Sequence, residues 1–285
     1  MAMSSKTEAC ILTVLVGLCI AARTVAAEGR IDDALELDWG HGNVSADGQV
    51  ISLNLDKASG SGFHSKDTHL YARIDVQIKL VPNYSAGTVA TFYFISEGER
   101  ATHDEIDLEF LGNETGQPYT LHTNIFVNGT GNKEQQFRIP FDETTTEMIG
   151  FHTYSIIWSS WHILLLVDGT PIREFRNHTS GGVAYPSTQR MGLYGSLWNG
   201  DGWATQGGRV KTDWTKAPFV AQYRNFTATT SSPGGYYYDD HEMDGSAQQK
   251  MKEIRDKYMI YNYCTDEKNF INGTAPPQCS MPGTG

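Results

Sequence analysis

Short apolar or alternating segments recur along the chain at close spacing, and each is bounded by Gly, Asn, Asp or Pro. Segments of this kind, rich in β-branched and aromatic residues, are typical of β-strands. No helical pattern separates them, so a parallel sheet with crossover helices is not expected. We predict an all-β fold, an antiparallel sandwich or jelly roll. The expected strands cover residues 49–55, 71–80, 88–95, 106–111, 120–127, 153–158, 162–167 and 190–197.

The pattern changes after about residue 230. Residues 231–235 read SSPGG, which indicates a linker or loop, and an acidic stretch follows at 239–244. Within 248–261, apolar side chains recur at helical spacing, at Met251, Ile254, Tyr258 and Tyr261. We therefore expect a main domain over 28–230 and a short C-terminal extension over 231–285 that contains one helix.

Residues 1–27 resemble a secretory signal peptide. Lys6 precedes an apolar run over 9–22, and a small-residue stretch ends at Ala27. A membrane anchor needs about 20 apolar residues, and Arg23 ends this run earlier. We predict cleavage after Ala27 and a secreted protein without a membrane partner; an uncleaved anchor is the alternative.

Cysteines and glycosylation motifs agree with export. Cys10 and Cys19 lie in the signal, which leaves Cys264 and Cys279, 15 positions apart. In an oxidising compartment these two are expected to form one disulfide, the alternative being two buried thiols. N-x-S/T motifs also favour a secreted glycoprotein. They begin at Asn43, Asn83, Asn113, Asn128, Asn177, Asn225 and Asn272.

Charge and composition exclude other classes of protein. Lys and Arg number 22 against 33 Asp and Glu, so the net charge is -11. Proteins that bind nucleic acid need a basic face, so no nucleic-acid partner is expected. Charged residues make up 19% and aromatic residues 11%, which favours a packed fold over a disordered chain.

One predicted strand carries three acids. Glu105, Asp107 and Glu109 alternate with apolar residues, so all three carboxylates point to one face of the sheet. Three acids on one face repel one another, a cost that makes sense where carboxylates must hold different protonation states. Retaining glycosidases need two carboxyl groups about 5–5.5 Å apart, so the two Glu side chains must lean towards Asp107. A solvated polar face or a calcium site is the alternative.

The segment HDEIDLEFLGNETG at 103–116 resembles the active-site signature of xyloglucan endotransglucosylase/hydrolases, a plant branch of glycoside hydrolase family 16. The resemblance covers nearly all of the chain after the signal. It implies a curved antiparallel β-sandwich of the concanavalin-like jelly-roll type, with an open cleft and a C-terminal extension. Further matching segments are 59–66, 78–93, 118–137, 151–158, 167–175, 196–214 and 258–266.

The resemblance implies roles for the three acids. Glu105 is expected to be the nucleophile that forms a glycosyl-enzyme. Glu109 would protonate the leaving oxygen and then activate the incoming hydroxyl, and Asp107 would hydrogen-bond the nucleophile. Asn113 matches the glycosylation site of the family, and His103 is expected to have a supporting role.

The resemblance also implies sugar contacts along a glucan cleft. Trp198 and Trp203 suit stacking on sugar rings, with core packing as the alternative for each. Gly207 matches a loop position where the backbone approaches the acceptor. The remaining expected contacts are His122, Thr123, Asn124, Asn132, Lys133, Glu134, Gly202 and Asn269.

Several positions depart from the family pattern. Pro140 replaces a Trp, and Gln206 and Asn269 replace Arg, which removes rigid forked donors. A second cysteine pair of the extension is missing. These departures suggest an unbranched donor, such as cellulose or mixed-linkage β-glucan, as in a hetero-trans-β-glucanase. The other departures are Ala72 for Gly, Gly202 for Asp and Lys133 for Arg.

The sequence therefore predicts a secreted plant cell-wall enzyme that cleaves a β-1,4-glucan with retention and transfers it to xyloglucan. The hydrolytic branch of the family that the chain resembles carries an extra loop beside the cleft. No such insertion is present near 197–214, and the resemblance therefore favours transfer over hydrolysis. We expect a monomer in the apoplast, without cofactor or metal, although a structural calcium stays an alternative. The competing functions are a hetero-trans-β-glucanase, a hydrolytic xyloglucanase and a non-catalytic, lectin-like glucan-binding protein.

Overall fold

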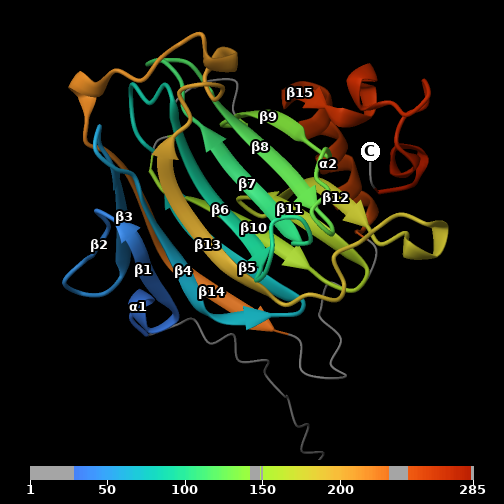
Figure 1. Cartoon of the computed structure of the whole chain (residues 1–285), viewed down its shortest axis with the longest axis horizontal. Helices are drawn as coiled ribbons and strands as arrows, with labels where there is room; N and C mark the ends of the chain where they lie inside the picture. The colour runs from blue at the N-terminus through green and yellow to red at the C-terminus, as the bar shows by residue number, and fades with distance from the viewer. Residues whose placement is uncertain (1–28, 142–147, 149, 231–242, 284–285) are drawn as a thin grey trace, which may run out of the picture.

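The computed structural model describes residues 29–141, 148, 150–230 and 243–283, and it contains two antiparallel β-sheets packed face to face (Figure 1). This confirms the predicted all-β sandwich. The predicted signal peptide at 1–27 and the start of the extension at 231–242 lie outside the described residues. Neither α-helix in the described part of the chain has the length and apolarity of a membrane-spanning segment.

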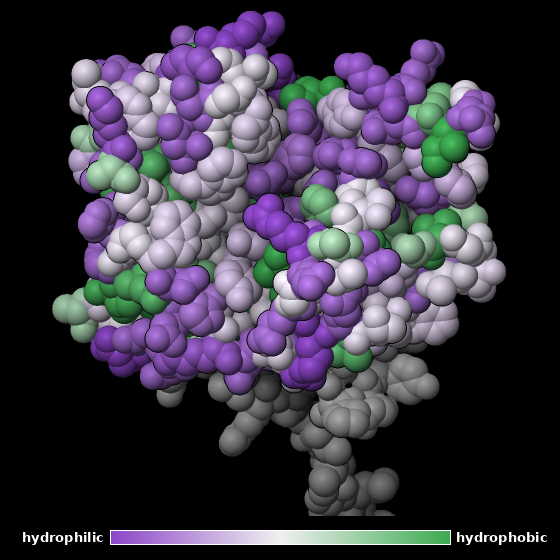
Figure 2. All heavy atoms as spheres, in the orientation of Figure 1, coloured by the Kyte–Doolittle hydropathy of each residue, from purple (hydrophilic) through white to green (hydrophobic). Residues whose placement is uncertain are grey.

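The first sheet has eight strands and carries the acidic segment near its middle, on β7. Its outer face is turned towards the viewer in Figure 1, and in the space-filling view it is largely polar, with apolar side chains in separate spots (Figure 2). In spatial order the strands are β1 (Leu35–Gly40), β4 (Ser61–His69), β13 (Met191–Asn199), β6 (Thr88–Ser96), β7 (Glu105–Leu111), β8 (Tyr119–Phe126), β9 (Gln135–Ile139) and β15 (Met259–Asn262).

The second sheet has seven strands and packs behind the first (Figure 1). Two of its strands, β3 (Val50–Leu55) and β5 (Ala72–Lys79), alternate buried and half-buried residues, as expected where one face of a sheet lies on a core. In spatial order the strands are β12 (Thr170–Arg176), β11 (His162–Val167), β10 (His152–Trp158), β5 (Ala72–Lys79), β14 (Phe219–Thr230), β3 (Val50–Leu55) and β2 (Asn43–Val44).

Aromatic side chains join the two sheets. Phe110 on β7 contacts Tyr154 on β10 edge to face, with ring centroids 4.5 Å apart. Ile106, Leu108 and Phe110, the apolar half of the acidic strand, are 0% exposed. Burial of each stabilises the fold by about 1.5–3 kcal/mol, so this face of β7 is fixed in the core. Because side chains alternate along a strand, the acids must then face outwards.

The two helices flank the sandwich: α1 (Ile31–Ala34) precedes β1, and α2 (Gly245–Tyr258) packs on β12. Asp244 caps α2 by accepting a hydrogen bond from the amide of Ala247, 2.8 Å away. The predicted helix over 248–261 was wrong at its end, because the chain becomes β15 at Met259. Tyr261 instead pairs with Gln136 on β9, whose edge offers backbone partners that a longer helix would leave unused.

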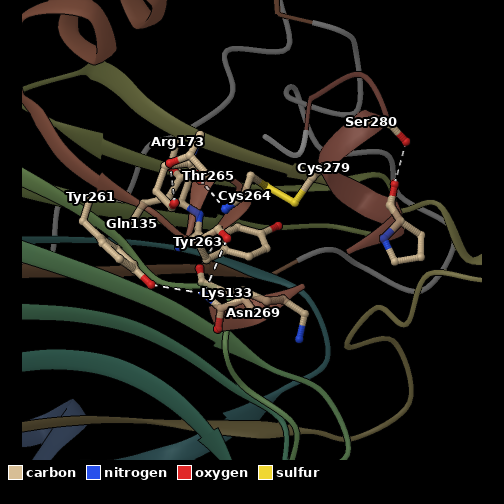
Figure 3. Close-up of a disulfide and its surroundings, with 12 residues drawn as sticks. Lys133, Gln135, Arg173, Tyr261, Tyr263, Cys264, Thr265, Asn269, Cys279 and Ser280 are labelled. Carbon is tan, nitrogen blue, oxygen red and sulfur yellow. Dashed lines mark hydrogen bonds between the residues drawn. A yellow bond between two sulfur atoms is a disulfide. The ribbon is translucent and has the colours of Figure 1, made fainter. Parts of the chain in front are cut away.

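A disulfide closes the chain after β15. Cys264 and Cys279 are joined as expected, with an S–S distance of 2.07 Å (Figure 3). Close to it, the fully buried Arg173 of β12 donates hydrogen bonds to Thr123 of β8 and to the carbonyl of Lys133. The extension, the seven-stranded sheet and the β8–β9 connection therefore meet at one place.

Replacing both Cys264 and Cys279 by Ser should loosen the extension. The two cysteines are 15 residues apart. A disulfide that closes a loop of that size stabilises the folded chain by about 3 kcal/mol, because it lowers the entropy of the unfolded chain. Hydrogen exchange should rise over 259–283 and stay unchanged in β6 and β7. Reduction of the unmodified protein should give the same pattern. Equal protection of 259–283 in both proteins would contradict a stabilising role for the disulfide.

Candidate active site

A cavity of ≈ 390 Å³ lies over β7 on the outer face of the eight-stranded sheet. Glu105, Asp107 and Glu109 all line it, so the structure places the three acids on one face. In the space-filling view of that face, the surface is hollowed near its middle (Figure 2). Among the residues described, no group of three or more His, Cys, Asp or Glu side chains could hold a metal ion.

Asp107 is the most enclosed of the three acids, at 6% exposure. Burial, then the neighbouring Glu105 and Glu109, raise the pKa of Asp107 well above its usual range. The Asp107 carboxyl also hydrogen-bonds Glu105, and this bond raises its pKa further. This direction favours a proton on Asp107, and a protonated carboxyl can donate to Glu105.

Glu109 lies at the other end of the acidic row. Burial, then the charge of Glu105, raise the pKa of Glu109 to about 7. Nε2 of His122 is 3.7 Å from its Oε2, while Nδ1 of His122 is 3.0 Å from Nε2 of Gln136. Burial, then the charge of Arg173, lower the pKa of His122 to about 4, so this imidazole is neutral. Glu109 thus keeps a proton in mildly acidic solution.

Glu105 has a direct partner that the sequence did not identify. Nε2 of His103 lies 2.8 Å from Oε2 of Glu105, and the His103 ring is 7% exposed. From the sequence we expected only a supporting role for His103, which precedes the strand. The carboxyl of Glu105 therefore lies between two hydrogen-bonding groups, His103 and Asp107.

Two tryptophans and a histidine gather beside Glu109. Trp203 follows β13 in a glycine-rich loop, and its ring centroid lies 6.2 Å from that of Trp198 and 6.0 Å from that of His122. Trp198 is half-buried on a small apolar cluster that contains Leu111 and Ala204. Trp203 is 39% exposed, so it offers a free aromatic face, whereas Trp198 combines packing with cavity lining.

Two of the expected sugar contacts point away from the cavity. Thr123 is 0% exposed and its Oγ1 donates to the carbonyl of Gln135, 3.1 Å away, because Thr123 faces the core. Lys133 is 7% exposed, and its Nζ is surrounded by backbone carbonyls. Burial, then the charge of Arg173, lower the pKa of Lys133 to about 8. Nζ donates to the carbonyls of Ile125 (3.4 Å), Thr130 (3.0 Å) and Gly131 (3.1 Å).

Of the remaining expected residues, one lines the cavity and the others lie in loops or in the extension. Asn124 lines the cavity, and its Oδ1 accepts from the amide of Lys133, 3.1 Å away. Asn269 lies in the extension, where its Nδ2 donates to the Tyr261 hydroxyl, 3.2 Å away (Figure 3). Exposed or half-exposed loop positions are Asn113, Asn132, Glu134, Gly202 and Gly207.

The cavity has lining residues that the sequence analysis missed. They come from β6, β8, β13 and the loop between β6 and β7. Alternation within the predicted strands could have identified Thr91 with Tyr93, since both face the same side as the acids, but strand order was needed to place β6 and β13 beside β7. The missed residues are Thr91, Tyr93, Ile95, Arg100, Phe126 and Ser196.

Comparisons with known proteins agree with this geometry. Residues 31–216 match glycosyl hydrolases family 16, and residues 232–279 match the xyloglucan endo-transglycosylase (XET) C-terminus. Xyloglucan endotransglucosylase/hydrolase protein 24 of Arabidopsis thaliana is 52% identical over 265 residues, which cover 92% of this chain and 95% of that protein. Xyloglucan endotransglucosylase/hydrolase 2 of Glycine max is 49% identical over 273 residues, 93% of this chain and 94% of its own.

Solved structures share the fold. A Bacillus licheniformis beta-glucanase superposes with a TM-score of 0.54 at 21% identity, over 73% of this chain and 96% of its own. An apo Crh5 transglycosylase gives a TM-score of 0.55 at 21% identity, over 80% and 89%. These structures support the two-sheet jelly-roll architecture.

Replacing Lys133 by Met should lower stability and leave sugar binding unchanged. The variant keeps the side-chain stem but removes the donor to three carbonyls, at a cost of about 1–3 kcal/mol. Denaturant unfolding and the KM for a glucan acceptor would be compared with those of Lys57→Met, the same substitution at an exposed lysine. A raised KM together with an unchanged free energy of unfolding would show that Lys133 contacts the sugar and contradict its structural role.

Proposed function

The chain belongs to the xyloglucan endotransglucosylase/hydrolases of glycosyl hydrolase family 16, and from this we propose that it cleaves a β-1,4-glucan with retention and transfers it to xyloglucan. One observation carries the proposal: β7 presents two glutamates in different electrostatic environments on one face of an open cavity. Glu109 holds a proton, with a pKa raised to about 7 by burial and Glu105. Glu105 instead accepts hydrogen bonds, as an attacking carboxylate must.

In the first step Glu105 attacks the anomeric carbon, and the glycosidic bond to the leaving sugar breaks. The leaving oxygen takes the proton of Glu109, so no alkoxide is released. The new bond is an ester between the sugar and Glu105. Strand geometry supports the pairing, because Cα atoms four residues apart are roughly 13 Å apart and long Glu side chains can lean together over Asp107.

In the second step an acceptor hydroxyl replaces the leaving sugar. Glu109, now a carboxylate, takes the proton of that hydroxyl, and the ester bond to Glu105 breaks. A sugar held beside the ester competes with water because positioning makes its attack effectively intramolecular. Trp203, 39% exposed beside His122 and Glu109, is the group that we assign to hold the acceptor. A mainly hydrolytic enzyme would lack a group that holds the acceptor in this way.

A second candidate differs only in its donor, which would be cellulose or mixed-linkage β-glucan. Gln136 and Arg138 lie two residues apart on β9, so both point to the outer face of the sheet, and Pro140 follows directly after the end of this strand. Pro140 is half-buried there, where the family has a larger Trp. A smaller side chain at this point alters the cleft wall without touching the acids.

The remaining features of the proposal are secretion and glycosylation. We assign 1–27 to a signal peptide, 28–230 to the catalytic domain and 231–285 to the extension. Asn113 is the proposed glycan site; its side chain is half-exposed, and Nδ2 donates to the carbonyl of Pro118, 3.0 Å away. We propose a monomer that acts in the plant cell wall and uses no cofactor, since the bond broken supplies the energy of the bond formed.

The secreted protein should join a labelled xyloglucan oligosaccharide to a polymeric donor. Xyloglucan, mixed-linkage glucan and cellulose would be offered separately, while labelled polymer and new reducing ends are both counted. Label on any donor supports transfer, and the donor that takes most label decides between the two candidates. New reducing ends without labelled polymer would contradict transfer and indicate a hydrolase. If neither labelled polymer nor new reducing ends form, the protein would be a non-catalytic glucan-binding protein.

Two variants sharpen this assay. Glu105→Ala should abolish both products, because no ester can form. Pro140→Trp should raise the share of label on xyloglucan if this position limits the donor. An active Glu105→Ala variant would refute the role of Glu105, and an unchanged donor ranking would remove Pro140 from the specificity.

The rate of transfer should fall as the pH rises above about 7. Glu109 must be protonated to act as the acid, and its raised pKa of about 7 keeps the proton on at lower pH. Glu109→Gln should lower kcat/KM by about 10²- to 10⁴-fold and remove this fall. A fall at the same pH in the variant would assign it to another group.

A further inference from the structure

Both ring nitrogens of His103 contact an oxygen. Nδ1 lies 2.6 Å from the carbonyl oxygen of Arg100, and Nε2 lies 2.8 Å from Oε2 of Glu105. The ring is 7% exposed and borders the cavity. Phe126 of β8 lies beside it, with ring centroids 5.2 Å apart, so the imidazole is held in a fixed plane.

These two contacts determine the protonation of the ring. A backbone carbonyl only accepts, and an ionised carboxylate only accepts. A neutral imidazole has a single N–H, so it could satisfy one of the two oxygens but not both. Either the ring carries two protons, or Glu105 carries one and cannot attack.

We propose that His103 is an imidazolium that donates one hydrogen bond to the Arg100 carbonyl and a second, charge-assisted one to the carboxylate of Glu105. The inference rests on the proposed function, in which Glu105 is the nucleophile. His103 acts through Glu105, so it is a positioning residue. A charge-assisted hydrogen bond is about twice as strong as a neutral one and shields Glu105 from the other acids.

The surrounding charges are consistent with a single anion at this point. Burial and the other acids raise the pKa of Asp107 well above its usual range, and that of Glu109 to about 7. Both shifts favour a proton on these two neighbours, and a neutral neighbour repels an ionised Glu105 less than a charged one does. The titratable and charged groups around the pair are Asp104, Asp107 and Glu109 from its own segment, and Tyr93 and Arg100 from β6 and the following loop.

The pair has a consequence for each step of transfer. When Glu105 bonds to the anomeric carbon, its charge is consumed in the ester and His103 loses its ionic partner. When the acceptor oxygen displaces the ester, the carboxylate returns and the charge-assisted bond forms again. His103 thus stabilises the carboxylate as the group that leaves in the second step.

The test compares pH profiles of kcat/KM for transfer. His103→Gln retains an N–H donor without charge, and His103→Phe retains only a ring. A nearby cation favours an ionised carboxylate, so its loss should move the acidic limb of the profile to higher pH. We expect a shift of about one pH unit for the Phe variant and a smaller one for Gln. His152→Gln is the control, because Nδ1 of His152 lies 2.7 Å from Asp168 on the other sheet.

A second measurement does not depend on activity. Nitrogen-15 NMR of histidine-labelled, full-length protein should show both His103 ring nitrogens protonated at the pH of maximal activity. A neutral ring there, or an unmoved acidic limb in a folded Phe variant, would overturn the inference. Failure of the proposed function would be seen differently: the unmodified protein would transfer no sugar. The NMR measurement of the His103 ring does not depend on that activity and could still be made.

Discussion

The packing of one face of β7 determines the chemistry of the other. Ile106, Leu108 and Phe110 are enclosed between the sheets, so the strand cannot rotate or slip by one residue without exposing them. The acids between them are thereby held together on the outer face, against their mutual repulsion. The hydrophobic core supplies the free energy that this arrangement costs. Burial, and then the repulsion from Glu105 and Glu109, raise the pKa of Asp107.

Much of the fold followed from the sequence, because alternation and turn residues are local signals. All of the expected strands occur, and the acidic strand begins two residues after His103. The edge of the eight-stranded sheet was not predicted. Residues 259–262 continue a helical spacing, and only the open edge of β9, distant in sequence, makes them a strand. Strand order likewise depends on long-range pairing that no local pattern contains.

The site was predictable where one strand carries it and less so elsewhere. The spacing of Glu105 and Glu109 placed them on one face. Thr123 could have been excluded by the same rule, since it lies between His122 and Asn124 and must face the core. Lys133 could not, because its environment consists of carbonyls that converge only in the folded connection between β8 and β9.

The position of β15 also sets an order for folding during synthesis. The central strands of the eight-stranded sheet are complete once residue 199 has left the ribosome, but the edge of β9 stays unpaired until residue 262 follows. A nascent chain therefore carries an assembled catalytic strand next to an open strand edge, the kind of surface that recruits other chains. β15, made long after β9, thus also covers the strand edge at which other chains could pair.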